Sequence, residues 1–283
     1  MMTITKDDSI YPGKLLEIKD PPQKLYLKGR EDLLNRRSIA IVGSRKCSEY
    51  GKIVAMKIAG EAVMNGFCVV SGMALGIDNF AHRGALKAGG DTIAVLGTGI
   101  DICYPRQHRD LYDRIVEEGL LISEQEPGTG PQRYTFPLRN RIIAGLSEAV
   151  IVVEARADSG SLITAELGMN QNKLVFAVPG NITSMFSLGT NRLISEGAQI
   201  VTVIDDIFCQ LGVEPRVSDE DLSELGKDEL CIYSLVKENG EMSIDMLCFR
   251  TGMDFVAVNT CVSALAMKGF VDYRMGKVLA IKF

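Results

Sequence analysis

The sequence lacks tryptophan, has only two histidines and contains no long apolar run. No stretch of 18 consecutive apolar residues occurs, so we expect no membrane span. The first residues, MMTITKDDSIYPGK, have no apolar core of a signal peptide, so we expect a cytoplasmic protein. Neither His82 nor His108 is accompanied by paired cysteines at ligand spacing, and we therefore expect no metal site.

The seven cysteines are scattered and include no CxxC pair. Most lie in apolar runs, so we interpret them as buried thiols in a reducing compartment. An excess of positive charge is also absent: the net charge of −5 argues against a protein that coats nucleic acid by charge alone. Residues 1–214 carry 23 basic and 25 acidic side chains, and residues 215–283 carry 8 and 11. A polyanion site is therefore expected as a local cluster in the first part of the chain.

Short β-branched runs alternate with amphipathic helical stretches through much of the chain. The runs expected as strands are Ser38–Gly43, Phe67–Gly72, Thr92–Gly97 and Ala149–Glu154, with weaker ones at Leu120–Ser123 and Leu174–Val178. Helical periodicity covers Gly51–Met64, Asp78–Lys87 and Gln107–Glu117. The alternation predicts an α/β fold with an extended Rossmann-like, doubly wound and mostly parallel sheet. Ligands of such sheets bind at the carboxyl ends of the strands.

Composition changes divide the chain into four segments. Residues 1–35 are expected as a separate lead segment with YP and DPP turns, and residues 36–213 as the Rossmann-like domain. The acidic, polar residues 214–228 are interpreted as a linker. Residues 229–283 are expected to form a small winged-helix-like domain. Its elements are three short helices, Glu229–Glu238, Ser243–Phe249 and Asp254–Met267, and a hairpin over Phe270–Ile281 that turns at Met275-Gly276.

The residues after the first strand could bind an anion. Gly43, Ser44 and Arg45 follow that strand, and Tyr50-Gly51 opens the next helix. Backbone amides at a helix start, with a hydroxyl and a guanidinium, form an anion site. The spacing is not G-x-G-x-x-G, and no acidic residue ends the second strand, so we expect no nicotinamide or other cofactor. Alone, G-S-R is equally typical of a simple turn with a solvated arginine.

Three further strand ends carry small or polar residues. They are Ser71-Gly72, Gly97-Thr98 and Ser159-Gly160-Ser161, the last of which can cap the helix beginning at Leu162. Each is compatible with ordinary turn chemistry. Together they favour a groove of backbone donors that binds phosphates.

Basic and aromatic side chains are expected beside that edge. The basic and amide candidates are Arg106, Arg139, Asn140 and Lys173. Arg139 and Arg141 point about 200° apart on a regular helix, so only one of them is expected to face a ligand. Alternatively, Arg139 and Arg141 form surface ion pairs and contact no ligand. Tyr50, Tyr104, Tyr134 and Phe136 could stack on bases, or simply pack.

The sequence shows no catalytic constellation. His82 is interpreted as a packing residue and His108 as exposed, and no nucleophile elbow or Ser/His/Asp order is visible. Glu154 and Glu166, on either side of the Ser-Gly-Ser loop, are the only carboxylates placed for acid–base work. We therefore expect a binding protein.

Motifs along residues 11–212 resemble those of the DNA-processing protein A family (DprA, also called Smf). They are YPGKLLEIKDPPQKLYLKG, VGSRKCSEYG, SGMALGID followed by AH at 81–82, AVLGTGIDICYP, FPLRNRIIAGLS, EARADSGSLITAELG and VFAVPGN. The resemblance implies an extended Rossmann fold that dimerises, holds single-stranded DNA in a basic pocket and loads the recombinase RecA onto incoming strands in natural transformation. By position, Ser44, Arg45 and Arg106 match the family's strand-binding sites.

Two other readings stay open. Rossmann-like phosphoribohydrolases are similar at the glycine-rich edge and would use a glutamate there on a nucleoside monophosphate, although the PGG-x-GT pattern is missing. Alternatively, the C-terminal part could read duplex DNA as a transcription regulator. Its third helix offers only Lys268 as a cation and no arginine, so we expect an interaction or packing domain instead.

Overall fold

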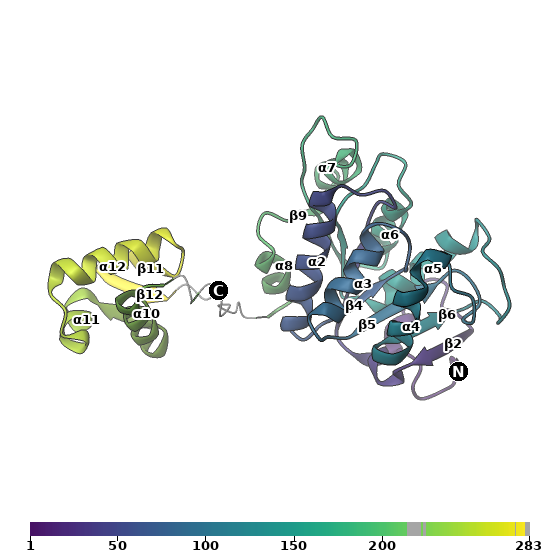
Figure 1. Cartoon of the computed structure of the whole chain (residues 1–283), viewed down its shortest axis with the longest axis horizontal. Coiled ribbons are helices and arrows are strands. Elements are labelled where there is room, and N and C mark those ends of the chain that lie inside the picture. The colour runs from purple at the N-terminus through teal and green to yellow at the C-terminus, as the bar shows by residue number, and fades with distance from the viewer. Residues whose placement is uncertain (214–221, 223–224, 275, 281–283) are drawn as a thin grey trace. The chain divides into compact units, whose positions relative to one another are not determined.

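The computed structural model describes residues 1–213, 222, 225–274 and 276–280. The chain divides into two compact units, Met1–Leu211 and Gly212–Phe283 (Figure 1). Most of the expected linker 214–228 lies outside the described residues, although α10 (Lys227–Asn239) begins within its last two positions. The domain limits drawn from composition stay a prediction.

A nine-stranded sheet forms the centre of the first unit. Its order is β1-β2-β6-β5-β4-β3-β7-β8-β9. The strands are β1 (Met2–Thr5), β2 (Lys24–Gly29), β3 (Ser38–Val42), β4 (Cys68–Ser71), β5 (Thr92–Leu96), β6 (Leu120–Ser123), β7 (Ala149–Val152), β8 (Leu174–Ala177) and β9 (Gln199–Ile200). All neighbours from β6 to β9 pair in parallel, and β1 and β2 are antiparallel. The predicted fold class is confirmed.

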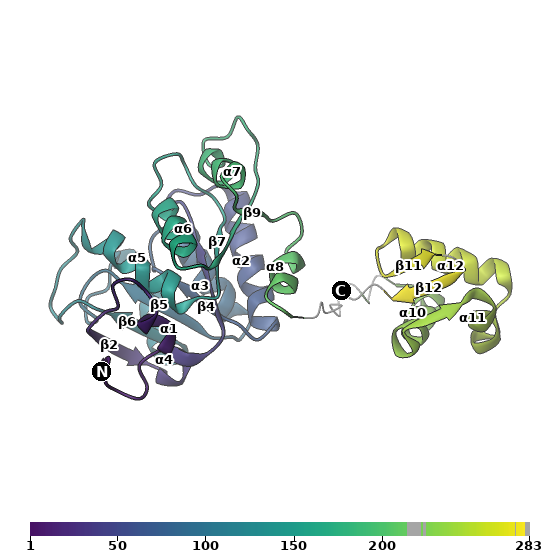
Figure 2. The ribbon, with the colours of Figure 1, turned by 180° about the vertical axis from the view of Figure 1, so that it is seen from behind.

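Helices cover both faces of this sheet, as Figures 1 and 2 show. One face packs against α1 (Gly13–Leu16), α5 (Thr135–Leu146), α6 (Gly160–Asn170) and α7 (Leu188–Ser195). The other carries α3 (Ile77–Lys87) and α4 (Arg109–Glu118), with α2 (Glu49–Met64) packed against α3. Burial on both faces explains why β3, β5 and β7 are continuous apolar runs. The remaining elements of the unit are the 3-10 helices η1 (Glu31–Asn35) and η2 (Arg106–His108), and α8 (Asp205–Gln210).

The first 35 residues differ from the expected separate lead. They add β1 and β2 to the edge of the sheet, and β2 pairs with β6 from Tyr26↔Ser123 to Gly29↔Leu120. Leu25 and Leu27 of β2 are fully buried in the main core. This pairing joins residues that are about a hundred positions apart in the chain. It therefore could not be predicted from the YP and DPP turns within the first 35 residues.

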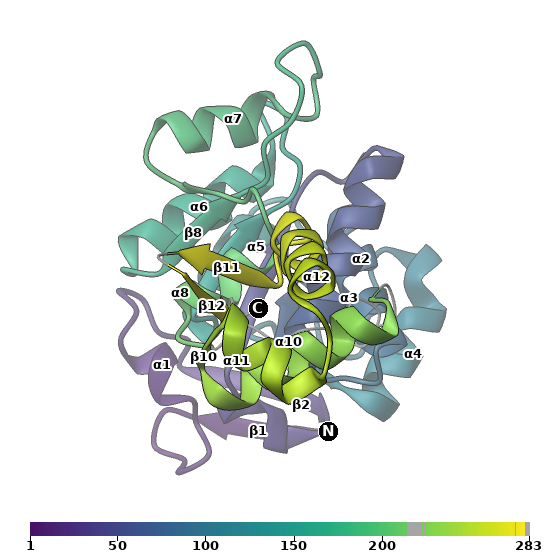
Figure 3. The same ribbon diagram turned by 90° about the vertical axis from the view of Figure 1, so that its left-hand side faces the viewer.

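The second unit has its own core and a winged-helix arrangement (Figure 3). The helices are α10, α11 (Ile244–Thr251) and α12 (Phe255–Met267), close to the predicted ranges. The strands β10 (Glu241–Ser243), β11 (Val271–Arg274) and β12 (Lys277–Ala280) form an antiparallel sheet in the order β10-β12-β11. The hairpin is therefore present, although Met275 and Ile281 lie outside the described residues. Among the described helices of both units, none is long and apolar enough to cross a membrane.

Candidate functional site

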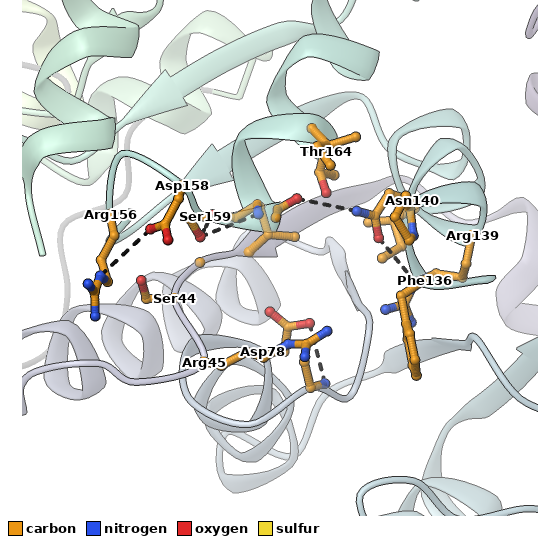
Figure 4. A pocket seen from close by; sticks show the side chains of 18 of the residues that line it. Ser44, Arg45, Asp78, Phe136, Arg139, Asn140, Arg156, Asp158, Ser159 and Thr164 are labelled. Carbon is orange, nitrogen blue, oxygen red and sulfur yellow. Dashed lines mark hydrogen bonds and ion pairs between the residues drawn. The ribbon is translucent and has the colours of Figure 1, made fainter. Parts of the chain in front are cut away.

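A pocket of about 470 Å³ opens at the carboxyl edge of the sheet in the first unit (Figure 4). Its lining comes mainly from the loops after β3 and β7 and from α5 and α6. β3 and β7 are neighbours, but the chain continues from β3 to β4 on one side and from β7 to β8 on the other. Strand order reverses at this point, which is the usual ligand site of an open α/β sheet. We call this cavity the switch-point pocket.

The switch-point pocket is more basic than the chain as a whole. Its cations are the exposed Arg45, Lys46, Arg133 and Arg156 and the buried Arg139, against the two carboxylates of Asp78 and Asp158. Within the described part of the chain, Arg45, Lys46 and Arg133 form no ion pair, and Arg156 pairs with Asp158 at 3.7 Å. The local cluster expected from the charge distribution is therefore present, and it suits a polyanion.

Arg139 of α5 connects the ends of two strands beside the pocket. Its Nη1 donates to the carbonyl oxygen of Gly72 at 2.8 Å and also to that of Val95. The amide of Gly72 donates to Asp78 Oδ2 at 3.1 Å. A Cβ on Gly72 would lie 2.5 Å from the guanidinium, so this position needs glycine. Burial lowers the pKa of Arg139 to about 10, and the side chain stays charged at neutral pH.

Asp78 is the counter-charge to Arg139. Burial raises the pKa of its carboxyl, and the Arg139 guanidinium opposes that shift. Together the two side chains hold the strand ends in place, and Arg139 adds positive charge to the pocket wall. Arg141, the other candidate of this helix, points away and binds Glu124 with Nη1 and Nη2 at 2.9 and 2.6 Å. Only Arg139 of the pair lines the pocket, as the helical geometry requires.

An aromatic pair extends the basic rim. The ring of Phe136 lies 5.5 Å from that of Tyr104, centroid to centroid, and the Arg45 guanidinium carbon lies 5.6 Å from the Phe136 centroid. A Cβ on Gly97 would approach the Phe136 ring to 2.7 Å, so glycine there lets the ring rest on the end of β5. Tyr104 is exposed. Such a cluster can stack on a base next to a bound phosphate.

The amino terminus of α6 forms another wall. Ser159 is its N-cap, and its Oγ accepts from the amide of Ser161 at 3.4 Å and lies 2.8 Å from Ser161 Oγ. Asn140 Nδ2 donates to the carbonyl of Gly160 at 3.4 Å and links α5 to α6 (Figure 4). The predicted Ser-Gly-Ser segment does cap the helix, but the helix begins at Gly160, two residues before the expected start at Leu162. A helix start directed at a basic cavity favours an anion.

Glu154 is a structural residue. It is buried, and its Oε2 accepts from the amide of Ser48 at 2.9 Å while Oε1 accepts from the Ser48 hydroxyl. Ser48 in turn caps α2 by accepting from the amide of Gly51 at 3.0 Å. Neither Glu154 nor the exposed Glu166 lines the pocket. The carboxylates considered for catalysis are thus outside the cavity.

The structure brings together most of the residues proposed from the sequence. Those that line the pocket are Gly43, Ser44, Arg45, Arg139, Asn140, Ser159, Gly160 and Ser161. Ser71 and Thr98 are buried behind it, where their hydroxyls donate to Ile41 O at 2.7 Å and Ile102 O at 3.0 Å. Like Gly72 and Gly97, they shape the strand ends without lining the cavity.

Two predicted residues lie elsewhere. Lys173 directly precedes β8, so it lies at the amino edge of the sheet, opposite the pocket, and does not join the site. Arg106 is exposed in η2, two residues beyond Tyr104, outside the pocket lining. Three cations of the pocket, Lys46, Arg133 and Arg156, were not predicted from the sequence. Lys46 and Arg156 follow strand ends and were open to the same rule, whereas the place of Arg133 depends on how its loop folds back.

Comparisons with known proteins identify the family of this chain. The family model of DNA recombination-mediator protein A matches residues 2–212. The chain is 47% identical over 203 residues to the DNA processing protein DprA of Streptococcus pneumoniae, covering 72% of each protein. It is 42% identical over 277 residues to the protein Smf of Escherichia coli, covering 95% of this chain and 74% of the relative.

A solved structure of DNA processing protein A from Helicobacter pylori, reported with its single-stranded DNA binding mode, has the same fold. It superposes with a TM-score of 0.67 at 33% identity, covering 75% of this chain and 96% of that one. The resemblance predicted from the motifs is confirmed, and this chain belongs to the DNA recombination-mediator protein A family.

Proposed function

We propose that this chain binds single-stranded DNA in the switch-point pocket and delivers it to a recombinase, RecA, during DNA uptake and recombination. The observation that carries the proposal is the local excess of cations at the strand-order reversal of a chain whose net charge is −5. Arg45, with no ion-pair partner among the described residues, is available to a phosphate, and its planar fork favours two parallel hydrogen bonds.

The pocket suits a single strand better than a duplex. Phosphates would meet Arg45, Lys46 and the start of α6, and an unstacked base would meet Phe136 and Tyr104. The bases of a duplex are stacked on one another and cannot use an aromatic platform in this way. The strand-binding mode named for the Helicobacter pylori relative supports the same assignment.

The proposed activity is binding without chemistry. Glu154 is committed to the start of α2, and Asp78 is held by two backbone amides beside Arg139. A phosphoribohydrolase-like reaction would need a carboxylate free to act on the ligand. Of the two carboxylates found in the pocket lining, Asp78 and Asp158, only Asp158 is exposed, and it lies 3.7 Å from Arg156. The description of the family as a recombination mediator supports RecA as the partner. A homodimer as the working form is proposed from the resemblance of the sequence motifs.

A competition titration tests this function. Purified chain should bind an unstructured oligonucleotide more tightly than a duplex of equal length, and the affinity should decrease with salt because phosphate contacts release counterions. Assays against nucleoside monophosphates should detect no release of base. Equal affinity for strand and duplex would overturn the assignment.

A further inference from the structure

The short connection between β3 and α2 carries two cations of the switch-point pocket. Arg45 and Lys46 are exposed and line the cavity. Only Cys47 separates them from Ser48, the N-cap of α2. We call residues 45–47 the cation loop. The direction in which its two cations point depends on how the ends of the loop are held.

The first end of the cation loop is held by backbone hydrogen bonds. The amide of Ser44 donates to the carbonyl oxygen of Glu154 at 2.7 Å, which continues the pairing of β3 with β7 past the ends of both strands. The carbonyl oxygen of Ser44 accepts from the amide of Ile77 at 3.2 Å. A Cβ on Gly76 would clash with that carbonyl, so glycine there lets the start of α3 pack against the loop. Residue 44 is therefore fixed from two sides.

The second end of the cation loop is held by the side chain of the same glutamate. Glu154 is only 4% exposed. Its Oε2 accepts from the amide of Ser48 at 2.9 Å, and its Oε1 accepts from the Ser48 hydroxyl. A Cβ on Gly51 would clash with this carboxylate, so the first turn of α2 also closes against it. Glu154 thus binds the residue before the loop with its main chain and the residue after the loop with its side chain.

Capping of α2 does not by itself account for this carboxylate. Ser48 already caps the helix, because its Oγ accepts from the amide of Gly51 at 3.0 Å. Ser243 caps α11 through the same kind of contact, at 3.2 Å from the amide of Met246, and among the described residues it has no carboxylate partner. What the Glu154 carboxylate adds is a tie between the end of the cation loop and the end of β7.

We propose, on the basis of the strand binding proposed above, that Glu154 is a positioning residue: by holding both ends of the cation loop, it directs Arg45 and Lys46 at the phosphates of a bound strand. A loop that is already ordered loses little conformational freedom when the strand binds, so more of the contact energy becomes affinity. Glu154 lies outside the pocket lining and acts through these two side chains.

Charge and position predict opposite effects for one substitution. Glu154→Gln removes a negative charge from beside a polyanion site, and charge alone would therefore strengthen strand binding. The substitution also replaces one acceptor oxygen by an amino group, which cannot accept from Ser48, so the loop loses a tie. Fluorescence anisotropy should show that the variant binds an unstructured oligonucleotide about tenfold more weakly, a difference of about 1.4 kcal/mol. The titration is done at a temperature where the melting curve shows the variant to be folded.

Two matched controls separate positioning from other effects. Glu166→Gln removes the same charge from the exposed side of α6, outside the pocket lining, and should bind at least as tightly as wild type. Ser38→Ala removes a buried hydrogen bond, 2.6 Å from Ser38 Oγ to the carbonyl oxygen of Leu146, at the amino end of β3. This variant loses stability far from the cation loop and should bind as wild type does.

The decisive measurement is the same substitution in a chain that lacks both cations of the loop. If Glu154 acts through Arg45 and Lys46, Glu154→Gln should cause no further loss of affinity when it is added to Arg45→Ala with Lys46→Ala. An equal loss in both backgrounds, or binding by Glu154→Gln as tight as that of wild type, would overturn the proposal. Absence of strand binding by the wild-type chain would instead overturn the function proposed above, and the positioning role with it.

Discussion

His82 is a buried histidine whose proton can be placed. Its Nδ1 lies 2.7 Å from Thr92 Oγ1, and the Thr92 hydroxyl donates to the carbonyl of Val69 at 2.7 Å. The only hydroxyl hydrogen is therefore used, so Nδ1 of His82 donates to Thr92. Burial lowers the pKa of His82 to about 3. The packing interpretation of this residue agrees with its place between α3 and β5, whereas His108, expected to be exposed, is buried against Met73.

This histidine makes stability depend on pH. In the unfolded chain the side chain takes up a proton near pH 6.5, but in the folded chain not until about pH 3, so the free energy of unfolding decreases as pH falls below about 6.5. Between pH 7 and pH 5 the titration of His82 should lower the free energy of unfolding by about 2 kcal/mol. Denaturant unfolding measures the free energy of unfolding of wild type and of His82→Gln at both pH values. The difference between the two proteins should change by about 2 kcal/mol from pH 7 to pH 5. A difference that is the same at both pH values would contradict it.

At the scale of single elements, Glu154 fixes the start of α2. Glu154→Gln replaces one carboxylate oxygen by an amino group, which cannot accept from Ser48. We expect the free energy of unfolding to decrease by about 2 kcal/mol, since hydrogen bonds to charged groups contribute about 1.5–3 kcal/mol. Glu166→Gln, on the exposed side of α6, is the matched control and should change stability by less than about 0.5 kcal/mol. Equal effects in thermal unfolding would contradict the anchoring role.

Strands that are buried on both faces were predictable, and the edge strands were not. β3, β4, β5 and β7 are continuous apolar runs whose carboxyl ends carry small or polar residues, and the strand-end rule led directly to Ser44, Arg45 and Ser159. β1 and β2 were missed because β2 joins the sheet by pairing with the distant β6, and β1 joins it only through β2. Lys173 was misplaced although its position directly before the expected strand Leu174–Val178 puts it at the amino end of that strand, away from the residues that follow strand ends.

At the scale of the whole molecule, the switch-point pocket belongs to the first unit alone. Its lining runs from Val42 to Thr164, and the main core is contained in Met1–Leu211. A chain ending at Leu211 should therefore keep its affinity for a single strand, because the part removed is net acidic. Fluorescence anisotropy on one oligonucleotide compares the two chains. A loss of more than about tenfold, or 1.4 kcal/mol, would show that residues beyond Leu211 contact the strand.

In the proposed function Arg45 of the switch-point pocket binds a phosphate of the DNA strand, and the salt dependence of strand affinity tests this contact most directly. Arg250 of α11, exposed and outside the pocket, is the matched control. Arg45→Ala should bind every sequence more weakly and lower the slope of log affinity against log salt by about one, because one fewer counterion is released. Arg250→Ala should bind as wild type does, and both variants should melt normally. Wild-type affinity and slope in Arg45→Ala would contradict the account.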